Sequence, residues 1–162
     1  MSNQKNKVVF LVIAIIAAIV IGYFFIANPN KTNHVDDSGK DDKELIESIK
    51  IRINDNEFKV IVDKNKAAQE FAESTPFELE MRELNGNEKY YRGEDKLDTS
   101  AEYKPGSIKA GDLMLYEDDT IVLFYKDFES QYKYTRLGWV QNADNLAEIL
   151  GDDNVSVIFT KQ

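Results

Sequence analysis

Residues 104–140 read KPGSIKAGDLMLYEDDTIVLFYKDFESQYKYTRLGWV, and this stretch decides the fold. It contains the only Trp of the chain and four of its eight Tyr. The Pro-Gly pair at 105–106 suits the two central positions of a type II turn. Residues 113–116 and 120–125 are apolar runs on either side of a polar turn at 117–119, a pattern that predicts a β-hairpin. Because residues 120–125 are apolar on both faces, we expect a central strand there.

The rest of the chain beyond residue 48 continues this β-rich pattern. Alternation of apolar and polar residues predicts further strands at 49–53, 58–62, 77–84, 133–140 and 155–160. Two segments have helical spacing: 65–74, with an expected N-cap at Asp63, and 145–150, with a cap at Asn142 or Asp144 and Gly151 at its end. Residues 88–97 read as a loop or irregular edge, and 126–132 as a loop. Seven or eight short strands and two short helices predict a mainly β fold, a closed or nearly closed barrel with helices over its ends.

An uncharged segment precedes this domain. Residues 8–27, VVFLVIAIIAAIVIGYFFIA, are long enough to cross a bilayer as one transmembrane helix. Lys5 and Lys7 lie just before it, which predicts a cytoplasmic N-terminus and an extracytoplasmic domain. The alternative is a cleaved signal peptide, but a cut after Ala27 would place the bulky Phe25 at the −3 position. We therefore expect an uncleaved signal anchor and a single-pass protein of the cell membrane.

These patterns divide the chain into three parts. Residues 1–27 are the predicted cytoplasmic tip and anchor, 28–48 a flexible polar tether, and 49–162 the barrel domain. His34, the only His, falls in the tether, so catalysis that depends on His is not expected. The chain has no Cys, which excludes disulfides, thiolate metal sites and a Cys nucleophile.

The charge and the acidic clusters narrow the function further. The net charge is −9, and the first 27 residues contribute +2, so the remainder carries −11 and nucleic acid is not an expected partner. The acids at 118–119 and 152–154 lack the spacing of a calcium-binding EF-hand loop. The sequence contains neither a Gly-rich phosphate loop nor a G-x-S-x-G elbow. We predict no metal site, no cofactor and no catalytic residue.

Several runs resemble a known family. PGSIKAGDLMLYEDDTIVLFYKDF, followed by YKYTRLGWV and a short helix ending in LG, resembles the bacterial cyclophilin-like domain family. The upstream run FELEMRELNGNEKYY is similar to the same family's strand and Asn-Gly-Asn turn. The resemblance covers about residues 49–160 and is most specific over 105–138. It implies a closed eight-stranded β-barrel capped by two short helices.

The resemblance does not extend to the residues of the cyclophilin isomerases. Those enzymes carry an FHR…QGGD-type pattern, and this sequence has no such string. Its four arginines, Arg52, Arg82, Arg92 and Arg136, lie in other contexts. The resemblance therefore implies the fold and not the isomerase activity.

Aromatic residues near the end of the opening stretch suggest a binding surface. Tyr132, Tyr134 and Arg136 lie two residues apart, so on a strand they share one face. With the neighbouring aromatics they predict a groove with one cation, suited to a peptide, a proline ring or a small anionic ligand. The alternative is that the aromatics are barrel core and Arg136 pairs with a surface acid. The predicted ligand-binding residues are Tyr125, Phe128, Tyr132, Tyr134, Arg136 and Trp139.

Three functions fit these observations. The first is a membrane-anchored, extracytoplasmic, non-catalytic domain that binds a peptide or small molecule. The second is a divergent peptidyl-prolyl cis-trans isomerase acting on extracytoplasmic proteins. The third is an accessory subunit in which the anchor and tether matter more than any pocket. The missing isomerase pattern favours the first.

Overall fold

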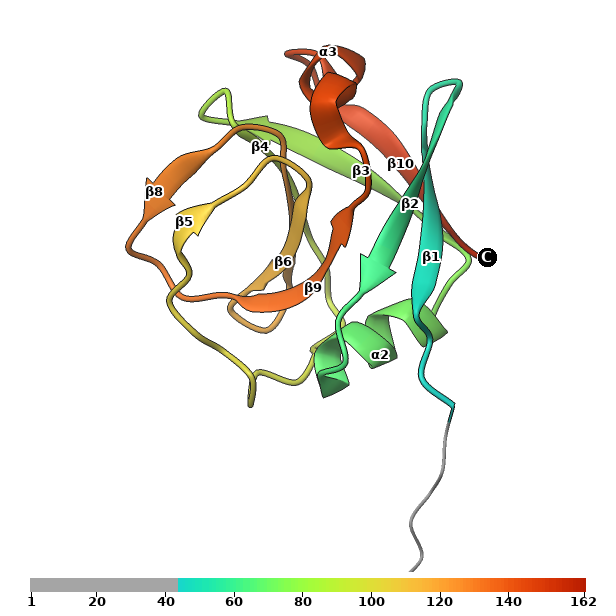
Figure 1. The fold of residues 1–162 in the computed structure, drawn as a ribbon, viewed down its shortest axis with the longest axis vertical. Helices are drawn as coiled ribbons and strands as arrows, with labels where there is room; N and C mark the ends of the chain where they lie inside the picture. The colour runs from blue at the N-terminus through green and yellow to red at the C-terminus, as the bar shows by residue number, and fades with distance from the viewer. Residues whose placement is uncertain (1–43) are drawn as a thin grey trace, which may run out of the picture. The chain divides into compact units, whose positions relative to one another are not determined.

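The computed structural model describes residues 44–162. Eight antiparallel strands close into a barrel in the order β1-β10-β3-β4-β7-β6-β9-β2, with β2 paired to β1 (Figure 1). This confirms the predicted mainly β fold with a closed eight-stranded barrel and two short helices. The barrel strands are β1 (Ser48–Ile53), β2 (Asn56–Val62), β3 (Phe77–Leu84), β4 (Glu88–Arg92), β6 (Asp112–Tyr116), β7 (Thr120–Phe124), β9 (Thr135–Val140) and β10 (Val155–Lys161).

The predicted membrane span at 8–27 and most of the predicted tether lie outside the described residues. Within residues 44–162, no helix is both long and apolar enough to cross a membrane. The last residues of the predicted tether are held by the domain. The backbone N–H of Ile46 donates to Gln69 Oε1 at 2.8 Å, and the carbonyl of Glu47 accepts from the N–H of Val62 at 2.9 Å.

The main core fills the inside of the barrel. It combines the inward side chains of the strands with the apolar faces of helices α2 (Lys66–Glu73) and α3 (Leu146–Leu150), which lie at opposite ends of the barrel in Figure 1. Phe71 of α2 packs edge-on against Phe77 and Phe159, with ring centroids 5.2 Å away in each case. Each helix is too short to be stable alone, so its burial against the strands supports it.

The helix starts differ from those expected. The side chain of Asn65, not that of Asp63, caps α2 by accepting from the N–H of Ala68 at 3.0 Å. Asp63 instead accepts from both the backbone and the side chain of Asn65 and so orients the cap. Before α3 comes a short 3₁₀ helix, Ala143–Asn145, and neither Asn142 nor Asn145 makes a side-chain capping bond. Gly151 does end α3, with its N–H donating to the carbonyl of Ala147.

A second, smaller core lies on the outside of the barrel wall. Strands β5 (Gly106–Ile108) and β8 (Phe128–Ser130) form a separate two-stranded sheet, so part of the predicted loop at 126–132 is a strand. Ile108 and Phe128 of this sheet pack with Met114, Val122 and Phe124 of the barrel and with Tyr134, which precedes β9. All five residues of β7 are therefore buried, one face in each core, as the two-faced apolar run predicted.

The prediction of a loop or irregular edge at 88–97 was wrong over its first half. Glu88–Arg92 is β4, an interior strand paired to β3 on one side and β7 on the other. Its polar sequence hid it, because Lys89 occupies an inward position that normally holds an apolar residue. The Asn-Gly turn before it forms as predicted, with φ of 57° at Asn85 and 70° at Gly86, and sets its register.

Candidate ligand-binding site

The outer core is open to solvent at one edge, where it forms a hollow of about 280 Å³. We call this hollow the Tyr pocket. The lining comes from the end of β3, the β3–β4 turn and the start of β4, from one residue each of β6 and β7, and from β8 with the loop after it. Its lining residues are Leu84, Asn85, Asn87, Glu88, Tyr116, Val122, Phe128, Tyr132 and Tyr134.

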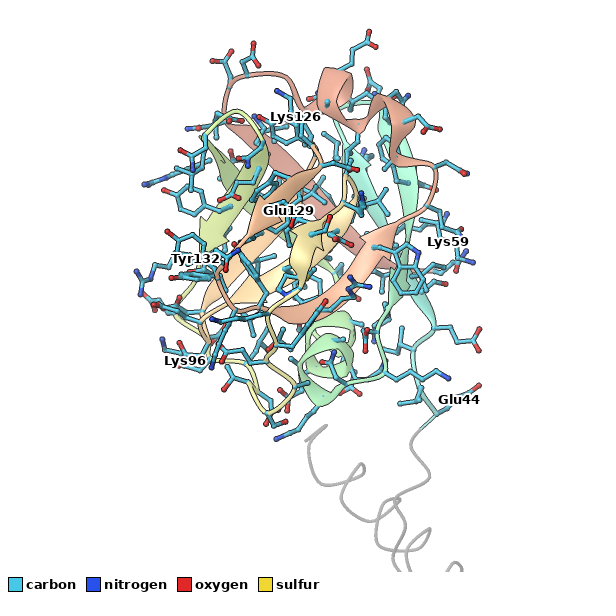
Figure 2. All side chains as sticks on the ribbon, turned by 60° about the vertical axis from the view of Figure 1, so that its left-hand side comes forward. Glu44, Lys59, Lys96, Lys126, Glu129 and Tyr132 are labelled. Atoms are coloured by element: carbon cyan, nitrogen blue, oxygen red, sulfur yellow. The ribbon has the colours of Figure 1, made fainter. Side chains whose placement is uncertain are left out.

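Three tyrosine rings line the pocket. The centroid of Tyr116 lies 6.0 Å from that of Tyr132, with the ring planes 88° apart. It lies 5.6 Å from that of Tyr134, with the planes 53° apart. Tyr134 is only 5% exposed, whereas Tyr132 is 64% exposed and stands at the surface in Figure 2. A ligand in the pocket therefore meets a fixed inner ring and a solvent-facing outer ring.

Two polar residues at the end of the β3–β4 turn, Asn87 and Glu88, belong to the lining. Asn87 Oδ1 itself is covered by the protein and has no hydrogen-bond partner. Such an acceptor costs about 1–3 kcal/mol when left unpaired. Beside it, burial and the charge of Glu83 raise the pKa of Glu88 from 4.5 to about 7. The lining thus contributes one carboxyl with a pKa near neutral pH.

The neighbouring Glu83 behaves in the opposite way. Burial alone would raise its pKa, but hydrogen bonds from Lys89, Tyr125 and the N–H of Gly86 outweigh burial and lower it. Lys89 is 0% exposed, and its Nζ also donates to the carbonyls of Gly151 and Asp153 at 2.7 Å each. Lys89, the cation nearest in sequence to Glu88, therefore makes its hydrogen bonds on the inner side of the barrel wall and does not pair with Glu88.

Of the six predicted ligand-binding residues, the structure brings three together. Phe128, Tyr132 and Tyr134 line the Tyr pocket. Tyr125 belongs to the main core, where its hydroxyl donates to Glu83 at 2.9 Å. Trp139 lines a different hollow.

Arg136, the sixth, is not among the residues that line the pocket. Its Nη2 lies 3.7 Å from Oδ1 of Asp112, a carboxylate that is itself buried, and its Nε is buried without a partner. Strand β9 begins only at Thr135, so the alternation that was expected to align Arg136 with Tyr132 and Tyr134 does not extend through them.

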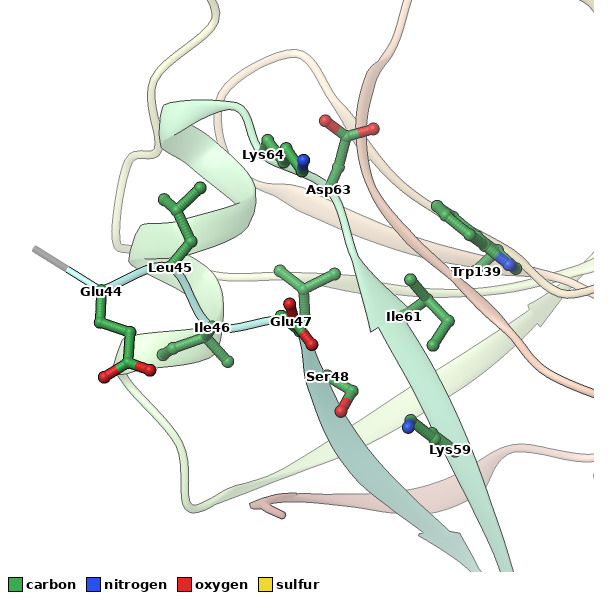
Figure 3. A pocket seen from close by; sticks show the side chains of 11 residues that line it. Glu44, Leu45, Ile46, Glu47, Ser48, Lys59, Ile61, Asp63, Lys64 and Trp139 are labelled. Atoms are coloured by element: carbon green, nitrogen blue, oxygen red, sulfur yellow. The ribbon is translucent and has the colours of Figure 1, made fainter.

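The hollow that Trp139 lines is larger, about 760 Å³ (Figure 3). We call it the N-terminal hollow. It lies between residues 44–48, strand β2 and Trp139, and its walls carry charges of both signs from Glu44, Glu47, Lys59 and Lys64. One wall of the N-terminal hollow, residues 44–47, lies outside the barrel strands. The Tyr pocket, lined by residues of four barrel strands and by three tyrosines, is the better candidate site.

Sequence reasoning missed Asn87 and Glu88. The sequence did contain a signal for them. The Asn-Gly-Asn turn predicts that a strand follows, and in such a strand Glu88, Tyr90 and Arg92 share one face. Metal binding has no comparable candidate: among residues 44–162, no three His, Asp or Glu side chains are grouped to hold a metal ion.

Comparisons with known proteins agree with this architecture. The sequence profile described as the cyclophilin-like family matches residues 51–160, two thirds of the chain and nearly all of the barrel. The chain belongs to the cyclophilin-like family. Among solved structures, it is similar to the solution structure of the hypothetical protein AF2241 from Archaeoglobus fulgidus. The TM-score is 0.56 at 16% identity, and the match covers 75% of this chain and 99% of that one.

The similarity to AF2241 shows a shared fold and nothing more, because the identity is low. No curated protein matches the chain. Membership of the cyclophilin-like family thus establishes the barrel, and the function is argued from the Tyr pocket.

Proposed function

We propose that this cyclophilin-like chain is a membrane-anchored, extracytoplasmic binding domain that holds a peptide or small molecule in the Tyr pocket and does not catalyse a reaction. The observation that carries the proposal is a solvent-open aromatic hollow that three tyrosines line together with the carboxyl-bearing Glu88. Ligand sites combine an apolar, preformed cavity with a few polar groups that fix orientation, and the Tyr pocket has both.

The anchor part of the proposal rests on the 20 uncharged residues at 8–27 and on Lys5 and Lys7 before them. We expect the full-length protein to stay with the membrane fraction after washing with alkaline carbonate, and protease added outside intact cells to cut the tether. Mature protein that begins near residue 28 would contradict the anchor.

Binding is tested by thermal unfolding of the full chain against a panel of small molecules and of peptides with and without proline. A ligand that binds only the folded state raises the melting temperature in proportion to its concentration over Kd. Tyr132→Ala removes the exposed ring of the Tyr pocket, and Trp139→Ala, the matched control, removes an exposed ring of the N-terminal hollow.

We expect the ligand-induced rise to shrink in Tyr132→Ala and to persist in Trp139→Ala. The reverse pattern would move the site to the N-terminal hollow and contradict the assignment of the Tyr pocket. If no compound or peptide raises the melting temperature, the accessory-subunit function replaces the binding function.

A divergent peptidyl-prolyl isomerase is the second candidate. Family membership favours it, and the partly exposed Arg136 is the residue to test, because a guanidinium can donate to a peptide carbonyl. We expect a protease-coupled isomerisation assay on the full chain to show no rate above the uncatalysed one. Turnover that is abolished in Arg136→Ala would establish the isomerase instead.

A further inference from the structure

The charge in the lining of the Tyr pocket has one sign. The lining contains the Glu88 carboxyl, the amides of Asn85 and Asn87 and three tyrosines, but no Lys, Arg or His. The amides and hydroxyls can both donate and accept hydrogen bonds, so the sign comes from Glu88 alone. A cationic ligand would meet an opposite charge in this lining, whereas an anion would meet a carboxyl and no cation.

The aromatic rings favour the same kind of ligand. A ring face attracts a cation that lies within about 6 Å of the ring centroid. Three tyrosines line the pocket, and the Tyr116 centroid lies 6.0 Å from that of Tyr132 and 5.6 Å from that of Tyr134. The rings pack against one another at these distances, so a cation would lie over the ring surfaces that line the pocket and not between two rings.

Glu88 supplies an anionic charge without a counter-ion. The ion pairs among the described residues do not include Glu88, although they include its neighbours Glu83 and Lys89. Burial and Glu83 raise its pKa to about 7, so the charged form is disfavoured in the empty pocket. A cation in the pocket would compensate for both the burial and the repulsion.

We propose that the Tyr pocket binds the quaternary or alkylated ammonium group of a small molecule, held by Tyr116, Tyr132 and Tyr134 and neutralised by Glu88. A cavity of about 150 Å³ is enough for a benzene molecule, so the 280 Å³ pocket admits a trimethylammonium head and part of its chain. The inference rests on the proposed binding function and names its ligand class. The expected ligand charge also differs from the sequence analysis, which allowed a small anionic ligand beside Arg136. Arg136 is not part of the lining, and Glu88 is.

Choline and its isostere 3,3-dimethylbutan-1-ol have the same shape, but only choline carries a positive charge. Comparing their binding therefore shows the effect of the ligand's charge alone. Both are titrated into the full chain in detergent, and binding is followed by calorimetry and by NMR signals of the pocket residues. We expect choline to bind at least about tenfold more tightly than the isostere, since only the cation gains from the ring faces and from the Glu88 carboxylate. Equal or tighter binding of the isostere would overturn the proposal.

Two variants, each with one Glu replaced by Gln, test whether the attraction of choline comes from Glu88. Glu88→Gln keeps the shape of the side chain in the pocket, and Glu129→Gln neutralises an exposed acid of β8 that does not line it (Figure 2). We expect choline affinity to fall about tenfold in Glu88→Gln and to stay unchanged in Glu129→Gln. An equal loss in both variants would mean that only the general negative charge attracts choline, and would overturn the site.

The pH dependence gives an independent readout. Choline binding favours the ionised Glu88, so its affinity should rise between pH 6 and 8 in the wild type and stay flat in Glu88→Gln. The other titratable groups around Glu88 are Glu83, which is paired to Lys89, and the tyrosines Tyr116, Tyr125, Tyr132 and Tyr134. A rise that persists in Glu88→Gln would contradict the role of Glu88.

The outcomes of these experiments test the ammonium ligand separately from the proposed binding function. If neither choline nor the isostere binds but a peptide of the panel does so in a Tyr132-dependent way, the ammonium ligand is wrong and the binding function stands. If nothing binds in either experiment, both are wrong.

Discussion

Glu88 and Lys89 are neighbours in β4, and their side chains lie on opposite faces of the barrel wall. Glu88 lines the Tyr pocket on the outside, whereas Lys89 is completely buried on the inside and bonded to Glu83, Gly151 and Asp153. The period of two in a β-strand enforces this separation. The carboxyl and the ammonium therefore cannot pair with each other, and Lys89 neutralises Glu83 instead.

Replacing Glu88 by Gln tests its raised pKa through stability. A folded-state pKa of about 7 against the ordinary 4.5 means that the wild type loses stability as pH rises from about 4.5 through 7. The full effect would be ~3 kcal/mol, and because the carboxyl is partly exposed we expect about 1–2 kcal/mol. Urea unfolding should show Glu88→Gln more stable than wild type at pH 8 by this amount and equal to it at pH 4. Identical pH profiles would contradict the raised pKa.

Replacing Lys89 by Met tests the buried ammonium. The change leaves two carbonyls without their donor and Glu83 without its cation in a buried place, which should cost about 3–5 kcal/mol in the free energy of unfolding. Lys109→Met is the matched control, because Lys109 and its partner Asp127 are both exposed, and its loss should cost less than about 1 kcal/mol. Similar losses in the two variants would show that Lys89 contributes no more than a surface ion pair.

At the scale of elements, the barrel depends on close approach of β2 and β9. Val62 of β2 is opposite Gly138 of β9, and a Cβ atom added at Gly138 would lie 2.2 Å from the carbonyl oxygen of Ile61. Backbone, not a flexible side chain, occupies that space. Only Gly therefore allows these two strands to pair at this point and close the barrel.

Gly138→Ala should accordingly push β2 and β9 apart. We expect a loss of about 2–3 kcal/mol in the free energy of unfolding, typical of overpacking against a structure that must move. Gly93→Ala is the control, because its Cβ would meet the side chain of Tyr91 at 3.2 Å, which can shift. We expect it to cost about 1 kcal/mol or less. A mild effect of Gly138→Ala in chemical unfolding would mean that the strands separate easily.

For the molecule as a whole, the described residues contain everything that a folded domain needs. The barrel closes on itself, so no barrel strand is left as an open edge, and two cores lie on the two sides of its wall. The inner core holds the fold together, and the outer core, covered only by the short β5–β8 sheet, supplies the Tyr pocket. A binding site on the outer wall leaves the inner core undisturbed.

A chain that begins at residue 43 should therefore fold without the preceding segment. We expect its thermal unfolding midpoint to match that of the full chain within roughly 3 °C, with a single cooperative transition. Scanning calorimetry of the two proteins makes the comparison. A shortened chain that unfolds without a cooperative transition would show that residues 1–42 are needed for the barrel.

The sequence by itself determined the mainly β fold, because alternation, turn residues and two-faced apolar runs are local signals. It placed β1, β2, β3, β6, β7, β9 and β10 and both helices, and its resemblance to the cyclophilin-like family supplied the closure of the barrel. The sequence did not predict strand β4, because one of its inward positions holds Lys89 instead of an apolar residue. The burial of Lys89 depends on acceptors from the distant Gly151 and Asp153.

Only the tertiary structure decided which residues share a site. Glu88, Tyr116 and Tyr132 come from β4, from β6 and from the loop after β8, and strand pairing brings these segments together. The same pairing separates Tyr125, Arg136 and Trp139 from them, although those residues are close in sequence. Sequence spacing gives the face of one strand, whereas a pocket between several elements depends on long-range register, which no local pattern contains.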